Sequence, residues 1–301
     1  MNFEALIAFL EQNLIEYKEN AKTSSLVSIK IGGYAKIIIY PHTVEQLVGA
    51  VGKINALCIK YCVIGKGTNC YFCDGEYDGA VVVTSYINKI RTYGNFIEAQ
   101  CGAPMAKCSE ACIENGLSGM EFARGIPGSV AGGVYMNASA FGSCIADIVR
   151  YSAVYDVKGD KIIKMPREDH CFSDKHSVFS ENCNFIILET VFELSKGAKE
   201  NIRRLMSEFS EKRRKTQPLE YPSAGSVFKR PVGAYASKLI DDLGLKGLSV
   251  GGVSVSKKHA GFIVNVNGGT AGELLRLIDL IKVYVKAKSG FDLCEEIIYM
   301  E

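Results

Sequence analysis

The chain has 301 residues, of which 48% are hydrophobic, and its formal net charge is +2. This length and composition can bury a substantial core and favour two domains over one or three. The nearly balanced charge gives no basic footprint for nucleic acid, and no apolar run approaches the roughly 20 residues that span a bilayer. We therefore expect a globular protein that neither binds nucleic acid nor inserts into a membrane.

The N-terminal stretch MNFEALIAFLEQNL is predicted to form an amphipathic helix. Glu4 stands where a signal peptide carries positive charge, and no small-residue cleavage site follows. This pattern predicts a cytoplasmic protein. The eleven cysteines, an odd number without a secretory signal, predict thiols in a reducing compartment and not a disulfide framework.

Strands and helices alternate after this first helix. The run AKIIIY at 35–40 predicts a strand, Thr43 and Gln46 form a capping box that opens a helix, and 61–65 predicts the next strand. These elements together make a β-α-β unit.

The next segments continue the mixed pattern. Strands are expected at 80–83 and 95–99, and residues 103–116 predict a helix that Pro104 opens and Gly116 closes. The first domain is therefore predicted to be mixed α/β.

A charged helical segment at 198–218 separates this part from a second set of elements. Thr270 and Glu273 form another capping box, which opens a helix running to about residue 289. The remaining expected elements are a helix near 234–244, a strand at 261–266 and a strand at 295–300.

Four cysteines fall within sixteen residues, namely Cys58, Cys62, Cys70 and Cys73. The spacing in CYFC is one that zinc and iron–sulfur sites use. The competing interpretation takes LCIKYCVIG as a buried strand in which cysteine serves as a small hydrophobic residue. Only one of the two pairs has the two-residue spacing, so we predict no metal site.

Two glycine-rich loops carry the clearest chemistry of the first part. In VIGKGTN, at 63–69, Gly65 and Gly67 let the backbone turn sharply and point successive N–H groups at one spot, which suits a pyrophosphate. An ordinary turn is the alternative. In GIPGSVAGGVYMNASAFG, at 125–142, four glycines within nine residues indicate close approach to a flat ligand or simply a packing loop.

The stretch YPSAGSVFKRP places Ser226 behind a glycine and ahead of Lys229 and Arg230. Ser226 is either a turn residue or a hydroxyl held against an anionic substrate, and the two basic residues form either a solvated turn or a substrate contact.

Five segments together resemble one family. VSIKIGGYA, VIGKGTN, GLSGMEFARGIPGSVAGGVYMNASAFG, RRKTQPLEYPSAGSVFKRP and KHAGFIVN occur in the order found in UDP-N-acetylenolpyruvoylglucosamine reductases, flavoenzymes that make UDP-N-acetylmuramate for bacterial peptidoglycan. The resemblance runs from about residue 23 to the C-terminus. The short spacing between the two domains resembles the form that lacks an extra substrate-covering loop.

The resemblance implies a mixed α/β (α+β) fold with an FAD-binding domain of the vanillyl-alcohol-oxidase type and a smaller α/β substrate-binding domain. The implied divisions are an N-terminal helix and lead-in at 1–29, the FAD-binding domain at 30–195, the substrate-binding domain at 196–289, and a C-terminal strand at 290–301 that returns to the FAD domain.

The resemblance also implies non-covalently bound FAD and NADPH as the reductant, with small molecules as the only partners and no obligate protein partner. No histidine or cysteine lies within 63–69 or 125–138 to make a covalent link. The residues implied to contact FAD are Gly65, Lys66, Gly67, Thr68, Asn69, Gly125, Ile126, Pro127, Gly128, Ser129, Gly132, Gly133, Asn137 and Ala138. Those implied to contact the substrate are Lys229, Arg230 and Gln217.

In this family NADPH reduces the flavin and leaves, after which the enolpyruvyl sugar nucleotide takes a hydride at its vinyl carbon and a proton at the neighbouring carbon. By resemblance Ser226 donates that proton. A serine hydroxyl is a very weak acid, so it needs a strongly basic acceptor, and an enolate stabilised by nearby donors is one. The family's glutamate falls on Glu296, with Glu295 as the competing choice; the strand alternation, aligned on Leu293, favours Glu296.

The segment FSDKHSVF departs from the family, which carries tyrosine and arginine where this chain has Asp174 and Lys175. Ile298 likewise stands where an arginine is usual. Lys175 is predicted to take over the arginine's role, with His176 as the less favoured substitute. These departures leave a second interpretation open, a divergent flavin-binding relative without this reductase activity.

Overall fold

The computed structural model describes residues 2–301, and residue contacts divide them into two compact units. The first unit comprises the chain up to Glu19, Ile37–Lys66 and Gly79–Lys212. The second comprises Asn20–Lys36, Gly67–Asp78 and Arg213–Glu301. The division by contacts falls at 212/213, inside a helix, and the domain boundaries given above stay a prediction.

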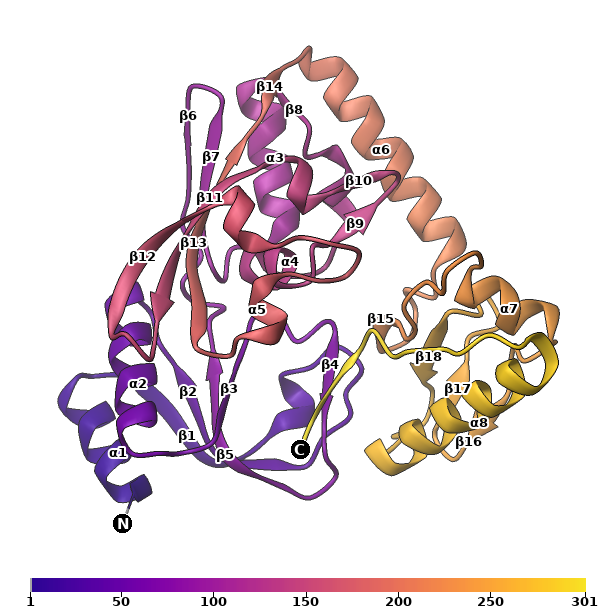
Figure 1. Ribbon diagram of the computed structural model, residues 1–301, viewed down its shortest axis with the longest axis horizontal. Coiled ribbons are helices and arrows are strands. Elements are labelled where there is room, and N and C mark those ends of the chain that lie inside the picture. The colour runs from indigo at the N-terminus through magenta and orange to yellow at the C-terminus, as the bar shows by residue number, and fades with distance from the viewer. Residues whose placement is uncertain (1) are drawn as a thin grey trace. The chain divides into compact units, whose positions relative to one another are not determined.

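The first unit is built around a five-stranded antiparallel sheet, with strand order β12-β11-β13-β7-β6 (Figure 1). In that order its strands are Lys161–Pro166, Val149–Asp156, Phe185–Glu193, Phe96–Gln100 and Ile90–Tyr93. Two small pairs accompany it, β9 (Ser139–Ala140) with β10 (Ser143–Cys144), and β8 (Leu117–Ser118) with β14 (Ser195–Lys196).

A second sheet has the order β1-β2-β5-β3, and its strands are Glu16–Lys22, Tyr34–Tyr40, Glu76–Val83 and Tyr61–Ile64. The β-α-β prediction is correct in its elements, because β2, helix α2 (Val44–Ala56) and β3 follow one another. Strand β5 lies between β2 and β3 and pairs with β3 in parallel, Tyr61 opposite Ala80.

In helix α2 the cap at Thr43 is present, but the second bond expected of a capping box goes to the N–H of His42 and not to that of Thr43. Thr43 accepts the Gln46 N–H at 3.2 Å, while the Gln46 side chain takes the N–H of His42 at 2.8 Å. Helix α3 (Met105–Asn115) begins after Pro104 and ends at Gly116, which adopts φ 60°. A glycine closes this helix at little cost because it has no Cβ to clash in the left-handed region.

The remaining helices are α1 (Asn2–Gln12), α4 (Val130–Tyr135), α5 (Val178–Glu181) and α6 (Lys199–Thr216), with 3-10 turns at Thr23–Ser25, Glu121–Gly125, Ile145–Asp147 and Arg167–His170. One buried cluster joins α1 and α2 to the inner strands through residues such as Leu10, Val51 and Ile39. Another joins α3 and α4 to the five-stranded sheet through Cys108, Val134 and Phe192.

The interpretation of residues 57–65 as one buried strand is wrong for its first half. Cys58 is exposed and has φ 52°, and strand β3 begins only at Tyr61. Residues 57–59 instead close α2, since Cys58 donates to the Asn55 carbonyl at 3.0 Å and Ile59 to the Ile54 carbonyl at 3.1 Å.

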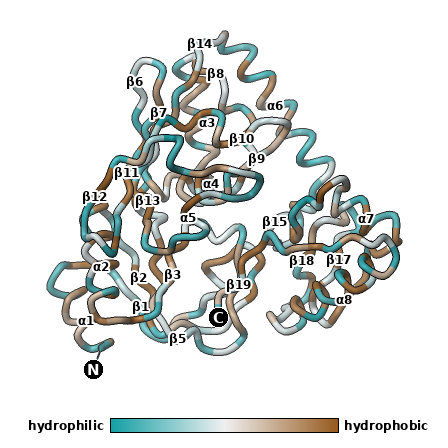
Figure 2. The backbone as a smooth tube through the Cα atoms, viewed as in Figure 1, coloured by the Kyte–Doolittle hydropathy of each residue, from teal (hydrophilic) through white to brown (hydrophobic). Residues whose placement is uncertain are grey.

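The second unit contains a four-stranded sheet of order β15-β18-β17-β16, with strands Ser223–Ser226, Phe262–Asn265, Val253–Val255 and Ser249–Val250. Helix α8 (Ala271–Ser289) packs on β16, β17 and helix α7 (Ala236–Asp242) (Figure 1). Along α8 the backbone tube alternates between apolar and polar colours (Figure 2), as a helix with one buried face requires. Its Thr270–Glu273 capping box is present as expected.

The C-terminal strand is shorter than expected. Strand β19 covers Ile298–Met300 and pairs in parallel with β4 (Cys70–Phe72). Glu295 and Glu296 precede this strand. Among residues 2–301, we find no helix with the length and apolar character needed to cross a bilayer.

Candidate active site

The loop that follows β3 offers a row of backbone donors. Gly67 has φ 58°, and a Cβ there would collide with the carbonyl of Leu26. The Gly67 carbonyl accepts the N–H of Ser28 at 2.8 Å, which fixes the loop. Within residues 2–301, no hydrogen bond uses the N–H groups of residues 66–69. These N–H groups are available to an anionic group such as a pyrophosphate.

In the first unit, Gly65 packs against the second glycine-rich loop. A Cβ at Gly65 would collide with Ser129 Oγ, so the lack of a side chain lets the two loops meet. Ser129 is buried and its Oγ accepts the Gly132 N–H at 3.3 Å at the start of α4. The N–H groups of Gly128 and Ser129 donate to no group within residues 2–301. The structure thus brings together two of the segments predicted to contact FAD.

The rest of the 125–138 segment is fastened internally. Ile126 donates to the Ala123 carbonyl at 3.0 Å, after the turn that Gly125 ends, and Gly133 lies against Met105, whose Sδ would be 3.3 Å from a Cβ. Ala138 donates to the Gly133 carbonyl at 2.8 Å.

The side chain of Asn137 is hydrogen-bonded to two other segments of the first unit. Its Nδ2 donates to the Ser173 carbonyl at 2.9 Å and its Oδ1 accepts the Ala146 N–H at 2.9 Å. The residue is buried and has φ 42°. Its amide is therefore engaged inside the protein, a use that the sequence did not reveal.

Lys175 lies at the corner of a tight turn in the first unit. Ser173 and His176 exchange backbone hydrogen bonds of 3.2 and 3.3 Å around it, and Lys175 adopts φ 53°. The turn is held to the end of α4, since Ser177 Oγ donates to the Tyr135 carbonyl at 2.7 Å. A non-glycine residue in this left-handed region is uncommon, so the surrounding bonds impose the conformation.

Asp174 and His176, on either side of Lys175, differ from it in exposure and contacts. Asp174 is exposed, whereas Lys175 is half-buried. The His176 ring lies 2.9 Å from a carboxylate oxygen of the exposed Glu181, so this histidine is turned toward that side chain. These placements favour Lys175 over His176 as the basic group of the segment.

In the second unit, Ser226 ends strand β15 opposite Phe262. The preceding Gly225 has φ 80°, and a Cβ there would meet nothing within 4 Å. A glycine is therefore needed for the backbone angle and not for space. Ser226 Oγ forms no hydrogen bond with any residue in 2–301. A half-buried hydroxyl without an internal partner is suited to a ligand.

Glu296 is fastened beside the Ser226 segment by backbone bonds. Its N–H donates to the Val227 carbonyl at 2.7 Å, and Asn69 Nδ2 donates to its carbonyl at 3.0 Å. The Asn69 carbonyl in turn accepts the N–H of Ile298 at 2.9 Å. The structure thus brings Ser226, Glu296 and Asn69 into one neighbourhood of the second unit.

Glu295, the competing glutamate, is committed elsewhere. Its carboxylate lies 2.9 Å from Lys282 Nζ on α8, and this hydrogen bond raises the pKa of Lys282. Its backbone bridges to Phe228. The ion pair of Glu295 supports the choice of Glu296.

The three residues predicted to contact substrate differ in their surroundings. Lys229 donates its N–H to the Cys294 carbonyl at 2.8 Å, and its ammonium group has no partner within residues 2–301. Gln217 follows α6, half-buried, with no hydrogen bond from its side-chain amide in the described chain. Arg230 is exposed and its guanidinium stacks 3.9 Å from the centre of the Tyr235 ring. Lys229 and Gln217 therefore have groups to offer a ligand, whereas Arg230 is partly occupied.

No metal centre emerges from the part of the chain that the structure describes. Within residues 2–301, no three His, Cys, Asp or Glu side chains are placed to hold a metal ion. The cysteines there are thiols and not halves of disulfides.

Comparison with known proteins identifies the family. A family model described as UDP-N-acetylenolpyruvoylglucosamine reductase, C-terminal domain, matches residues 217–300, and one described as FAD binding domain matches residues 35–164. The UDP-N-acetylenolpyruvoylglucosamine reductase of Caldicellulosiruptor bescii is 40% identical over 299 residues, covering 99% of this chain and 94% of the relative. That of Clostridium novyi is 38% identical over 282 residues, covering 94% of this chain and 91% of the relative. The chain belongs to the UDP-N-acetylenolpyruvoylglucosamine reductase family.

A solved structure of the same family agrees. MurB from Thermus caldophilus has a TM-score of 0.80 and 27% identity, covering 95% of this chain and 99% of that chain. The grass pollen allergen Phl p 4, which has glucose dehydrogenase activity, has a TM-score of 0.50 and 15% identity over 65% of this chain and 44% of its own, a likeness of fold alone. The expected mixed α/β fold, an FAD-binding domain of the vanillyl-alcohol-oxidase type with a smaller substrate domain, is confirmed.

As a member of this reductase family, the chain is a flavin-dependent oxidoreductase, and FAD is its cofactor. The residues present fit that cofactor. In the second unit the N–H groups of residues 67–69 form a donor row of the kind that holds a pyrophosphate, and in the first unit those of Gly128 and Ser129 likewise have no acceptor within residues 2–301.

Proposed function

We propose that this chain reduces UDP-N-acetylglucosamine enolpyruvate to UDP-N-acetylmuramate, with NADPH as the reductant. The observation that carries the proposal is the arrangement around Ser226. Its hydroxyl and the Lys229 ammonium have no partner within residues 2–301, while Glu296 is fastened to Val227, the next residue after Ser226. The second unit therefore presents a proton donor, a carboxylate and a cation on segments that are hydrogen-bonded to one another.

With FAD bound, the flavin would supply the hydride for the vinyl carbon of the substrate, and NADPH would be the source of that hydride. Ser226 Oγ then gives its proton to the carbon next to the substrate carboxylate. A serine hydroxyl gives up a proton only to a strong base, so the negative charge that forms on the substrate must remain partly localised there until transfer. Preset donors lower the energy of that charge without making it unreactive.

Lys175 is the group we assign to that charge in the first unit, and Glu296 is the second member of the catalytic set, on the segment beside Ser226. Lys229 and Gln217 suit the diphosphate or carboxylate of the substrate, because both have unoccupied donors. Arg230 contributes less, since its guanidinium already stacks on Tyr235.

The proposal requires only small molecules as partners. A net charge of +2 offers no footprint for nucleic acid, and the reaction needs no second protein. NADPH and UDP-sugars are metabolites of the cytoplasm, so we place the reaction there.

The decisive experiment follows the flavin colour without oxygen. The purified protein is expected to be yellow, to release FAD on mild denaturation because the link is non-covalent, to bleach with NADPH, and to regain its colour with the enolpyruvyl substrate. Bleaching without recovery would indicate the divergent flavin-binding relative. A colourless protein that cannot be reconstituted with FAD would overturn both.

A further inference from the structure

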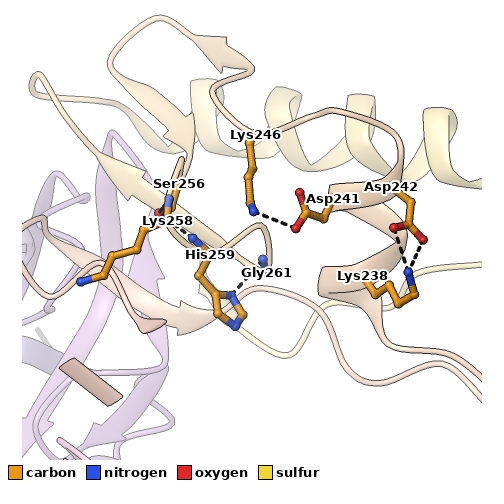
Figure 3. A network of polar contacts seen from close by, with 8 residues as sticks. All are labelled: Lys238, Asp241, Asp242, Lys246, Ser256, Lys258, His259 and Gly261. Carbon is orange, nitrogen blue, oxygen red and sulfur yellow. Dashed lines mark hydrogen bonds and ion pairs between the residues drawn. The ribbon is translucent and has the colours of Figure 1, made fainter. Parts of the chain in front are cut away.

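The connection between β17 and β18, residues 256–261, is closed by a histidine that the reaction scheme does not use. Ser256 Oγ accepts the N–H groups of Lys258 and His259 at 3.1 and 3.2 Å. His259 Nδ1 then accepts the N–H of Gly261 at 3.2 Å (Figure 3). The ring thus completes a turn that two residues of the same loop begin.

This turn is fitted tightly around the imidazole. A Cβ on Gly261 would lie 3.1 Å from both His259 Cε1 and Ser237 Cβ, so the glycine makes room for the ring. The ring also meets Phe262 edge-on, with centroids 4.9 Å apart and planes at 75°. Phe262 donates its N–H to the His259 carbonyl at 3.0 Å.

The residues that His259 holds are those that face the proton donor. The Gly261 carbonyl accepts the Val227 N–H at 2.9 Å, and Phe262 is the register partner of Ser226. The same strand β15 carries the left-handed Gly225, so Ser226 follows a residue with few backbone constraints of its own. The position of Ser226 therefore depends on its pairing with the end of β18.

We infer that His259, with Nδ1 unprotonated, is a positioning residue that fixes the Gly261–Phe262 edge and thereby the place from which Ser226 donates its proton. The inference rests on the proposed function for its catalytic consequence. Its structural part, the support of the Val227–Gly261 bond by the imidazole, is testable without any turnover.

Protonation of the ring would break this support. With a proton on Nδ1, two N–H groups would face each other across the turn. Burial lowers the pKa of His259, partly countered by its own backbone. The charged groups facing the ring are Lys246, which also lowers that pKa, and Asp241 on α7, which raises it; the two pair with each other at 2.7 Å (Figure 3).

Lys258 and Glu220 carry two other charges near this turn. Lys258, on the turn itself, donates a hydrogen bond from Nζ to the Arg214 carbonyl at 2.7 Å and lies 3.8 Å from a Glu220 oxygen.

The pKa of His259 is lower in the folded chain than in the unfolded chain. The contribution of His259 to stability is therefore present above the unfolded pKa of about 6.5 and is lost as pH falls below it. The pairing of β15 with β18 should weaken in the same direction.

The test compares His259→Leu, which removes the acceptor, with His259→Asn, which offers Oδ1 in its place. His42→Leu is the control, since His42 is an exposed histidine that binds Glu16 and stacks on Tyr86. Amide hydrogen exchange of the peptide covering residues 223–230 is read in each protein with FAD bound. Stopped-flow absorbance then separates flavin reduction by NADPH from reoxidation by the substrate.

His259→Leu is expected to raise exchange at 223–230 and to slow reoxidation on the order of tenfold, the rate equivalent of one lost hydrogen bond, while flavin reduction stays at the parental rate. His259→Asn should keep exchange at 223–230 and the rate of reoxidation close to the parental values, and His42→Leu should leave both at those values. If His259→Leu does not fold, the parent serves by itself: exchange at 223–230, corrected for the intrinsic slowing of amide exchange in acid, is expected to rise as pH falls through the lowered pKa of His259.

Unchanged exchange in His259→Leu, or corrected exchange in the parent that does not vary with pH, would overturn the positioning role. A parent protein that shows the exchange effects but never reoxidises with the substrate would leave the support of the strand intact and would contradict the proposed function instead.

Discussion

Asn69 Nδ2 donates a hydrogen bond of 3.0 Å to the carbonyl of Glu296, a residue 227 positions away in the chain. The Asn69 carbonyl accepts the N–H of Ile298 in the same segment. One residue of the glycine-rich loop thus holds the backbone on both sides of Ile297. A residue implied to contact the cofactor is also a support for the candidate catalytic glutamate.

Replacement of Asn69 should therefore affect more than FAD binding. Asn69→Ala loses the side-chain bond to Glu296, which should lower the free energy of unfolding by about 1 kcal/mol and slow substrate reduction in protein saturated with FAD. The neighbouring Thr68→Ala is the matched control, because the Thr68 side chain has no partner within residues 2–301. Thermal unfolding and stopped-flow absorbance measure the two effects. Equal behaviour of the two variants at saturating FAD would contradict the support role.

Ser226→Ala should separate the two halves of the reaction. Flavin reduction by NADPH needs no proton from Ser226, whereas substrate reduction does, so only the second step should slow, by a factor on the order of 10² to 10⁴. Anaerobic stopped-flow traces with each partner alone provide the measurement. Equal slowing of both steps would mean that Ser226 serves the placement of the flavin.

Lys175 tests the departure of this chain from its family. Lys175→Ala should nearly abolish substrate reduction while sparing flavin reduction, because the ammonium group is the charge assigned to the substrate intermediate. The double change Asp174→Tyr with Lys175→Arg should raise the rate, since a guanidinium grips a carboxylate through two parallel bonds and stays charged. Lysine, arginine and alanine at position 175 would all occupy the same left-handed corner without glycine, so the backbone cost at that position is matched. Turnover of Lys175→Ala at the parental rate would make Lys175 a bystander.

Gly225 and Gly75 form a matched pair for the backbone. At each position a Cβ would meet nothing within 4 Å, but only Gly225 has a positive φ, of 80°. Gly225→Ala should therefore lower the free energy of unfolding by about 1 to 2 kcal/mol through backbone strain, and should also slow substrate reduction. Gly75→Ala should be close to neutral or slightly stabilising. Chemical denaturation of both variants decides, and similar losses would show that strain is not the cause.

The sequence predicted local features well where one residue type has one physical use. The Thr270–Glu273 box, the glycine that ends α3 and the helix at 199–216 all formed as expected, because capping and helical periodicity depend on neighbours in the chain. The wrong prediction of a strand at Cys58 also came from residues nearby in the chain. Its apolar neighbours indicated a strand, whereas the hydrogen bonds that close α2 extend through Ile59.

The residues of the candidate site were predicted mainly from the family motifs, whereas the hydrogen bonds that support those residues were not predicted. Asn137 and Asn69 were predicted to contact FAD, and the structure adds a second role for them, because both side chains donate to carbonyls of the protein. Their partners, Ser173 and Glu296, are distant in sequence, and no pattern of nearby residues encodes such a pairing. The choice of Glu296 over Glu295 was supported once the ion pair of Glu295 with Lys282 was known.

The parallel pairing of β4 with β19 sets an order on the folding of the second unit. Residues 67–78 leave the ribosome before the strand that completes their pairing, because Ile298 follows its partner Cys70 by more than 200 residues. Asp74 likewise has its hydrogen-bond partners far along the chain, at the start of α8, where its carboxylate accepts the N–H groups of Ala271 and Gly272 at 2.6 and 2.9 Å. Contacts between such distant segments form slowly because a long loop must close first. A nascent chain stalled before Ile298 would therefore expose an unpaired β4 edge to chaperones and proteases, and a fragment limited to residues 217–300 would lack the partners that hold its helix and its last strand.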